Sequence, residues 1–146
     1  MVSPIEVIKY SKKISVLYVE DDLVLRDATQ KLFENYFTHI DVAGDGAEGL
    51  DKYSNSFNND NKYDLIITDI NMPKMNGIDM CKEIFKINPS QRIIITSAHS
   101  KHIDIVKEMG IKATLAKPLD SVELSESIYK ISKEIYDEKE ASQNNF

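Results

Sequence analysis

Short, uninterrupted apolar runs separated by amphipathic segments constrain the fold of this chain more than any other feature. Three runs are rich in Val, Ile or Tyr and too short for a core helix: Ile14–Val19, Leu65–Thr68 and Arg92–Thr96. Two weaker candidates of the same size are Ile40–Ala43 and Ala113–Ala116. Because continuous apolar runs of this length are typical of strands buried on both faces, they predict the strands of a parallel sheet.

Helical periodicity fills the intervals between these runs. Apolar residues recur at helical spacing in five segments, which begin near Leu25, Gly46, Ile78, Ile103 and Leu124. Gly110 is expected to end the fourth of these helices, and Asp120 or Ser121 to cap the fifth. A strand followed by a helix, repeated along the chain, predicts an α/β fold with a five-stranded parallel sheet and five helices.

One domain is expected, because a chain of 146 residues can enclose a hydrophobic core without disulfides or structural metal. The expected organisation is an N-terminal extension over residues 1–13, the domain over 14–136, and a polar, frayed C-terminal tail over 137–146. Within the domain, Ser54–Lys62 is polar and rich in Asn, and predicts an exposed loop before the third strand.

Composition argues against several classes of function. The chain has 24 acidic and 18 basic residues and a net charge of −6, which argues against direct nucleic-acid binding. The single cysteine, Cys81, excludes an intrachain disulfide and a Cys-based zinc site, and its helical spacing predicts a core residue. No apolar run approaches a membrane span and no signal peptide opens the chain, so we expect a cytoplasmic protein without membrane contact.

Polar side chains gather at the points where the predicted strands end. They are Glu20, Asp21 and Asp22 after the first strand, Asp69 at the end of the third, Ser97 at the end of the fourth, and Lys117 after the fifth. Because the carboxyl ends of parallel strands meet at one edge of a sheet, these groups are expected to lie together. Asp22 directly precedes a helix and is expected to cap it, which leaves the two acids before it without a capping role.

The acid at the end of the third apolar run, Asp69, is poorly placed for burial unless a cation compensates it. Carboxylates gathered at one edge repel one another, and their pKa values rise unless a cation joins them. Mg²⁺ prefers oxygen ligands of this kind, and commonly uses one or two carboxylates together with water and phosphate. Lys117 cannot neutralise the cluster alone, but it can serve as a point charge for a phosphoryl oxygen.

Four segments of the chain resemble the signature of response-regulator receiver domains. They are Glu20-Asp21, the stretch DINMPKMNG from Asp69 to Gly77, Ser97-Ala98, and Lys117-Pro118. The match covers roughly residues 14–136, with the segments in the family's order at the expected strand ends. This resemblance implies a flavodoxin-like, doubly wound α/β fold.

The resemblance also implies a magnesium site and a phosphorylation site. Asp69 would accept a phosphoryl group from a histidine kinase or a phosphotransfer protein. Asp21 would bind Mg²⁺ directly together with Asp69, Glu20 would often act through water, and Asn71 would contribute its backbone carbonyl. Mg²⁺ would screen the acceptor carboxylate during its attack on phosphorus.

Two further groups are implied to contact the phosphoryl group once it is bound. The Ser97 hydroxyl would turn toward it, and the Lys117 ammonium would contact it directly. Pro118 suggests a cis peptide bond after Lys117. His99, two residues after Ser97, stands where family members tune phosphate lifetime, although a plain surface loop explains it equally well.

The implied function is a phosphorylation-controlled signalling module that promotes its own phosphorylation and dephosphorylation rather than an enzyme acting on external substrates. Its output would be a downstream protein target or an output domain beyond the chain. Two alternatives stay open: a degenerate interaction module without phosphorylation, and a Mg²⁺-dependent phosphohydrolase. The intact site residues disfavour the first. Asn71 disfavours the second, since a haloacid-dehalogenase type would have a second acid there.

One departure from the family pattern bears on the switch. Thr114 occupies the position three residues before Lys117, where family members usually carry a mobile aromatic residue. Threonine is too small to fill the space of a ring, and its β-branch restricts its rotamers. Activation is therefore predicted to move the loop from Ala98 to Lys101 without an aromatic ring turning inward.

Overall fold

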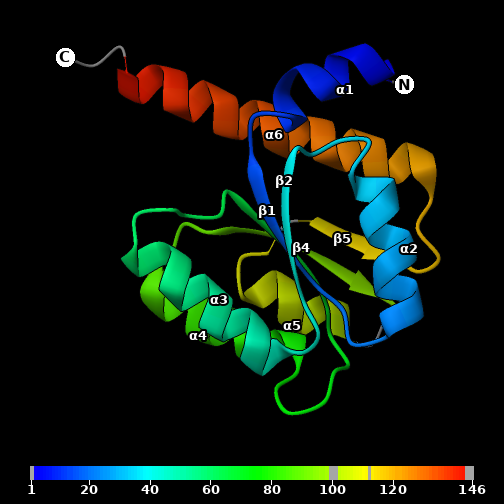
Figure 1. Ribbon diagram of the computed structural model, residues 1–146, viewed down its shortest axis with the longest axis vertical. Helices are drawn as coiled ribbons and strands as arrows, with labels where there is room; N and C mark the ends of the chain where they lie inside the picture. Colours follow the sequence, from blue (N-terminus) through cyan, green and yellow to red (C-terminus); the bar gives the residue numbers. More distant parts are fainter. Residues whose placement is uncertain (1, 99–101, 112, 144–146) are drawn as a thin grey trace.

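The computed structural model of the chain describes residues 2–98, 102–111 and 113–143. In these residues the strands form a single sheet in the order β2-β1-β3-β4-β5, and each neighbouring pair is parallel (Figure 1). The strands are β1 (Ser15–Val19), β2 (His39–Ala43), β3 (Leu65–Asp69), β4 (Arg92–Ser97) and β5 (Ala113–Ala116). The predicted five-stranded, doubly wound sheet is confirmed.

Helices cover both faces of the sheet (Figure 1). Across the described ranges they are α1 (Pro4–Ser11), α2 (Leu23–Phe33), α3 (Gly46–Asn58), α4 (Gly77–Ile87), α5 (Ile103–Glu108) and α6 (Ser121–Gln143). The last five are the predicted helices, and α1 is an addition, so the described chain has six helices rather than five. Helices α1, α2 and α6 pack on one face of the sheet, and α3, α4 and α5 on the other.

Strand position explains why three apolar runs are stronger than the other two. Strands β1, β3 and β4 lie inside the sheet, and nearly all of their residues are buried. Strands β2 and β5 are the two edges, and exposed residues interrupt their burial. An inner strand of a covered parallel sheet needs apolar side chains on both faces, whereas an edge strand does not.

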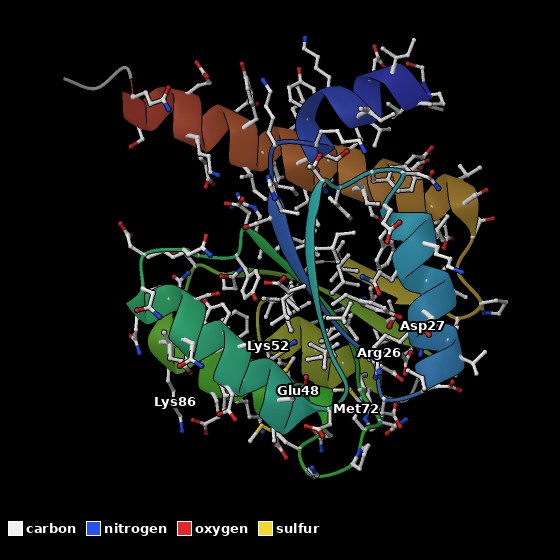
Figure 2. All side chains as sticks on the ribbon, in the orientation of Figure 1. Arg26, Asp27, Glu48, Lys52, Met72 and Lys86 are labelled. Carbon is white, nitrogen blue, oxygen red and sulfur yellow. The ribbon has the colours of Figure 1, made fainter. Side chains whose placement is uncertain are left out.

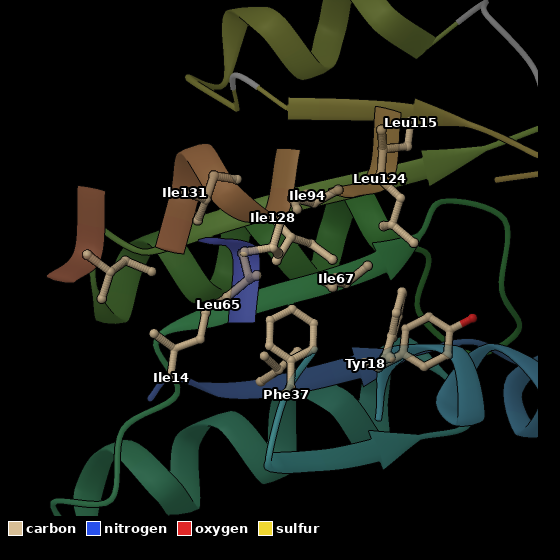
Figure 3. Packing of buried hydrophobic residues seen from close by; sticks show 14 residues of the cluster. Ile14, Tyr18, Phe37, Leu65, Ile67, Ile94, Leu115, Leu124, Ile128 and Ile131 are labelled. Carbon is tan, nitrogen blue, oxygen red and sulfur yellow. The ribbon is translucent and has the colours of Figure 1, made fainter. Parts of the chain in front are cut away.

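Two hydrophobic clusters fill the space between the sheet and its helices. In the first, Tyr18 of β1 meets Phe33 of α2 edge-to-face at 5.0 Å between ring centroids, and Ile128 of α6 packs nearby (Figure 3). The second cluster, on the opposite face, contains the predicted core residue Cys81. Burial raises the pKa of the Cys81 thiol to about 12, which makes it an inert core group.

The expected helix ends are also confirmed. The Asp22 carboxylate accepts a hydrogen bond from the Leu25 N–H at 3.1 Å and caps α2. The Asp120 carboxylate accepts one from the Glu123 N–H at 2.9 Å at the start of α6. Gly110 follows α5 with a φ of +88°, a left-handed conformation that glycine adopts without steric cost.

Helix α1 lies in the segment predicted to be an extension. Ser3 caps it, Pro4 opens it, and Val7 is fully buried in the first cluster. Tyr10 packs edge-on against Tyr129 and Tyr136 of α6, with centroids 5.9 and 5.2 Å apart. Helix α1 has only eight residues, and few of them face the core, so its sequence shows no apolar repeat at helical spacing. The helix therefore depends on its packing against α6.

The polar tail predicted to fray from residue 137 is helical in α6 as far as Gln143. This prediction was wrong because ion pairs replace apolar contacts along the last turns. Arg92 at the start of β4 pairs with Glu138 at 2.5 Å, and Lys139 pairs with Asp64 at 2.9 Å.

The predicted loop over residues 54–62 was also wrong in its first half, because α3 continues to Asn58. Phe57 stacks on Tyr53 one helical turn earlier, with ring centroids 6.1 Å apart. Between these rings, Asn55 is exposed, whereas Ser54 and Ser56 are half-buried. No helix within the described ranges has the length and hydropathy to span a bilayer.

Candidate functional site

The carboxyl end of the sheet brings together residues that are far apart in sequence. Glu20 directly follows β1, Asp69 is the last residue of β3, and Lys117 directly follows β5. Strands β1 and β3 are neighbours, and β4 joins β3 to β5. The predicted gathering of polar groups at one sheet edge is therefore observed for these three.

Lys117 forms the centre of this cluster. Its Nζ lies 2.6 Å from Glu20 Oε1 and 2.9 Å from Asp69 Oδ2. The exposed fractions of the three side chains are 18% for Lys117, 1% for Glu20 and 13% for Asp69. Charge-assisted hydrogen bonds at such low exposure are much stronger than surface ion pairs.

Backbone donors hold the remaining carboxylate oxygens of the two acids. The Ile70 N–H donates to Asp69 Oδ1 at 2.7 Å, and the Asp22 N–H donates to Glu20 Oε2 at 3.3 Å. One backbone N–H directly after Asp69, and another two residues after Glu20, thus help to orient these two carboxylates. Both carboxylates are fixed before any ligand arrives.

Gly77 allows the chain to pack closely against Asp69. A Cβ at this glycine would lie 2.0 Å from the Asp69 carbonyl oxygen, and the Gly77 N–H donates to the Ile70 carbonyl at 2.8 Å. The resemblance included Gly77 in the motif but gave no physical role for it. The structure shows that any larger residue would push the start of α4 away from the acidic cluster.

The electrostatics of the cluster follow from burial and pairing. Burial raises the pKa of the Glu20 carboxyl, although the hydrogen bond from Lys117 opposes this shift. Burial alone would lower the pKa of the Lys117 ammonium, but its hydrogen bonds to Glu20 and Asp69 outweigh that effect and leave its pKa raised. Lys117 therefore stays charged throughout the physiological range.

The acidic residues have the chemistry and spacing of a divalent-cation site. One carboxylate oxygen from each of Glu20, Asp21 and Asp69 lies within 4.8 Å of the other two. Glu20 is buried, Asp69 is partly buried and Asp21 is exposed, so the group opens toward solvent on the Asp21 side. Hard oxygen ligands with an open side suit Mg²⁺, which keeps several of its waters.

The other predicted site residues lie around this cluster. Asn71 lies two residues beyond Asp69 in the loop before α4, with an exposed side chain. Ser97 ends β4, and its carbonyl accepts a hydrogen bond from the Lys117 N–H at 2.9 Å, which ties the ends of β4 and β5 together. The roles of the Asn71 carbonyl and the Ser97 hydroxyl stay predictions.

Two predictions concern residues of β5 and the segment that follows it. The peptide bond between Lys117 and Pro118 is cis, as the resemblance implied. Thr114 is exposed on the edge strand β5. His99 and most of the loop expected to move lie outside the described residues, so the predicted loop movement stays a prediction.

One further residue near the site, Arg26, was not identified by sequence analysis. The Arg26 guanidinium, from the first turns of α2, donates to the Glu20 carbonyl at 2.9 Å. The available signal was a long basic side chain shortly after the acidic segment, at the start of the next helix.

The chain is similar to known proteins over most of its length. The sequence profile of the response regulator receiver domain matches residues 16–129. The chemotaxis protein CheY of Thermotoga maritima is 33% identical over 123 residues, which cover 81% of this chain and 97% of that protein. A transcriptional regulatory protein, the CpxR homolog of Haemophilus influenzae, is 33% identical over 111 residues, 75% of this chain but only 46% of that protein.

The fold is similar to that of a solved protein with a bound ion. The crystal structure of the response regulator protein TrrA from Thermotoga maritima, in complex with Mg²⁺ and BeF, superimposes with a TM-score of 0.70. It is 28% identical, and the match covers 81% of this chain and 98% of that one.

Proposed function

Because this chain belongs to the response regulator receiver domain family, we propose that Asp69 accepts a phosphoryl group from a histidine kinase or a phosphotransfer protein. The observation that carries the proposal is the position of Asp69, between a bridging ammonium and two further carboxylates. Lys117 pairs with Glu20 and Asp69, and Asp21 adds a third carboxylate that has no ion pair among the described residues, which leaves room for added positive charge.

The reaction is a transfer between two nucleophiles. A carboxylate oxygen of Asp69 attacks phosphorus, the bond from phosphorus to the donor nitrogen breaks, and the imidazole of the donor leaves. The product is an acyl phosphate on Asp69. Asp69 Oδ1 already accepts a hydrogen bond from the Ile70 N–H, and this contact limits rotation of the carboxylate.

Mg²⁺ fits the acidic group by the chemistry of its donors. We propose that Glu20, Asp21 and Asp69 hold the ion, with Asn71 contributing its backbone carbonyl. When bound, the ion supplies positive charge that screens the acceptor carboxylate and the phosphoryl oxygens. The excess of negative charge in a group of which Glu20 is buried and Asp69 partly buried supports this assignment.

Phosphorylation changes the partners that Lys117 can bind. A phosphoryl group adds about −1.5 to −2 charge, which favours a contact between its oxygens and the Lys117 ammonium. The Ser97 hydroxyl, at the end of the neighbouring strand, is proposed to donate to the same group. The switch is then proposed to act on a protein target, or on an output domain, through the face formed by α5, β5 and α6.

Acetyl phosphate provides a direct test that needs no kinase. Intact mass spectrometry after incubation with acetyl phosphate and Mg²⁺ should show one added phosphoryl group, and alkali should remove it. Asp69→Asn should fold and gain no phosphate. Asp22→Asn is the matched control, because asparagine caps a helix as well as aspartate does, and it should be phosphorylated like the wild type.

Two results would contradict the proposal. Phosphorylation of Asp69→Asn to the wild-type extent would place the acceptor elsewhere. A wild-type chain that gains no phosphate, but whose acidic cluster shows amide shifts with Mg²⁺, would favour the degenerate interaction module. Sustained turnover of external phosphomonoesters would instead favour the phosphohydrolase.

A further inference from the structure

The Arg26 side chain folds back over the loop that presents the acidic cluster. Arg26 lies near the start of α2, and its Nη1 donates to the carbonyl oxygen of Glu20, six residues earlier, at 2.9 Å. That carbonyl belongs to the peptide unit that joins Glu20 to Asp21. The hydrogen bond therefore restrains the rotation of the backbone from which the Asp21 carboxylate projects.

A second loop confines the guanidinium on its other side. A Cβ at Gly44, after β2, would lie 3.1 Å from Arg26 Nη1 and 3.3 Å from Glu48 Oε2. The same Glu48 oxygen accepts a hydrogen bond from the Gly44 N–H at 2.8 Å. Figure 2 shows Arg26 of α2 and Glu48 of α3 close together at this end of the sheet. The guanidinium thus lies between the loops that follow β1 and β2.

Asp21 has no side-chain anchor of its own. Across residues 2–98, 102–111 and 113–143, no hydrogen bond or ion pair holds its carboxylate, which is exposed. Glu20 and Asp69, by contrast, are both held by Lys117 and by backbone N–H groups. The orientation of Asp21 toward the other two acids consequently depends on its backbone.

We propose that Arg26 is a positioning residue for the cation site: by anchoring the Glu20 carbonyl, it holds the Asp21 carboxylate within the acidic cluster. The inference rests on the proposed function, since it takes Glu20, Asp21 and Asp69 to be the metal site. Removing a group that orients a metal ligand in this way commonly weakens metal binding by about 10–100-fold.

The charge of Arg26 acts in the opposite direction to its positioning role. A guanidinium near a cation site repels the incoming ion, so removing the charge alone would tighten Mg²⁺ binding. Removing the anchor would weaken it. The sign of the change in affinity therefore separates positioning from simple electrostatics.

The experiment measures the Kd of Mg²⁺ from amide chemical shifts of residues near the acidic cluster. Arg26→Met keeps the apolar stem but removes the charge and the donors, and Arg26→Lys keeps the charge and one donor group. Lys31 is exposed in the last turn of the same helix, and Lys31→Met is the control with the same change in charge. Thermal unfolding of each variant shows whether the fold is intact.

Arg26→Met should weaken Mg²⁺ binding about ten-fold, Arg26→Lys should recover part of the loss, and Lys31→Met should stay within about two-fold of the wild type. A melting temperature that falls without a change in Kd would assign Arg26 a structural role only and overturn the proposal. Unchanged or tighter binding by Arg26→Met would overturn it as well, as would a complete lack of recovery in Arg26→Lys.

If Arg26→Met does not fold, Arg26→Gln takes its place, because it removes the charge and shortens the side chain by two atoms: weaker Mg²⁺ binding than the wild type supports the anchor, and unchanged or tighter binding overturns it. Failure of the proposed function gives a different result. In that case the wild type itself would show no Mg²⁺-dependent shifts around residues 20–22 and 69–71.

Discussion

At the carboxyl end of the sheet, the Lys117 ammonium is held between two carboxylates almost removed from water, whereas at the amino end the Arg92 guanidinium meets carboxylates that are largely exposed. Glu20 and Asp69 have side chains 1% and 13% exposed, but Glu138 beside Arg92 is 66% exposed. The same kinds of charged group are therefore used at both ends, in different surroundings.

The balance of charge differs as well. At the amino end, Arg92 pairs with Glu134 and Glu138, and Lys139 pairs with Asp64, so each acid meets a nearby cation. At the carboxyl end, one ammonium pairs with Glu20 and Asp69, and the third acid of the cluster, Asp21, has no ion pair among the described residues. A buried excess of one charge is costly unless a ligand compensates it, so this excess distinguishes a binding site from a structural ion pair.

The largest effect on stability is expected when the ion pairs of Lys117 with Glu20 and Asp69 are removed. Lys117→Met should lower the free energy of unfolding by about 2–3 kcal/mol, because it leaves two poorly solvated carboxylates facing each other. Urea denaturation, with and without Mg²⁺, measures the loss. Mg²⁺ should restore part of it, since the ion supplies the missing positive charge. A loss no greater than that of Arg92→Met would remove the proposed distinction between the two ends.

A smaller effect is expected from Mg²⁺ on the wild-type protein. At a free Mg²⁺ concentration of about ten times its Kd, binding should add about 1.4 kcal/mol to the free energy of unfolding. Asp21→Asn should reduce this gain, while Glu138→Gln, at the other end of the sheet, should leave it unchanged. Differential scanning calorimetry at several Mg²⁺ concentrations provides the measurement. An equal reduction by both variants would show that the gain does not arise at the acidic cluster.

The two ends should also respond to acid in opposite directions. Burial raises the pKa of Glu20, so between its ordinary value and the raised value the folded protein holds a proton that the unfolded chain has released. Lowering the pH through this window stabilises the fold through Glu20. The hydrogen bond from Arg92 lowers the pKa of Glu138, so its contribution is present above the ordinary value and is lost as the pH falls through the lowered value.

Paired variants isolate these two contributions. The stability of the wild type relative to Glu20→Gln should rise from neutral pH to about pH 4, whereas its stability relative to Glu138→Gln should fall toward more acidic pH. Urea denaturation at each pH gives both differences, in which the titration of other carboxylates largely cancels. If both stability differences changed in the same direction as the pH falls, the expected contrast between the two ends of the sheet would be contradicted.

The smallest effect on stability is expected when Arg92, at the amino end of the sheet, is replaced. Arg92→Met should cost about 1 kcal/mol or less, because exposed ion pairs contribute little and salt screens them. The difference from the wild type should shrink further when NaCl is added. Thermal unfolding at low and high salt is the measurement. A loss that is independent of salt would mean that the Arg92 stem contributes by packing instead.

Much of the architecture could be predicted from the sequence because it depends on local pattern. The buried apolar runs fixed the strands, and helical periodicity fixed the helices that face the core. The strand ends also carried the acidic residues and Lys117, since the topology of a parallel sheet places its carboxyl ends at one edge. Asp22 as a helix cap and Cys81 as a core residue followed from their positions in the same way.

Tertiary contacts decided what the pattern did not contain. Helix α1 and the last turns of α6 lack an apolar repeat, and they are helical because Tyr10 packs on α6 and Arg92 pairs with Glu138. The bridge of Lys117 between two acids, and the anchor from Arg26 to the Glu20 carbonyl, depend on where long side chains turn in space. Residue type and spacing determine which elements form, whereas the direction of a flexible charged side chain is set by the partners that the folded chain brings within its reach.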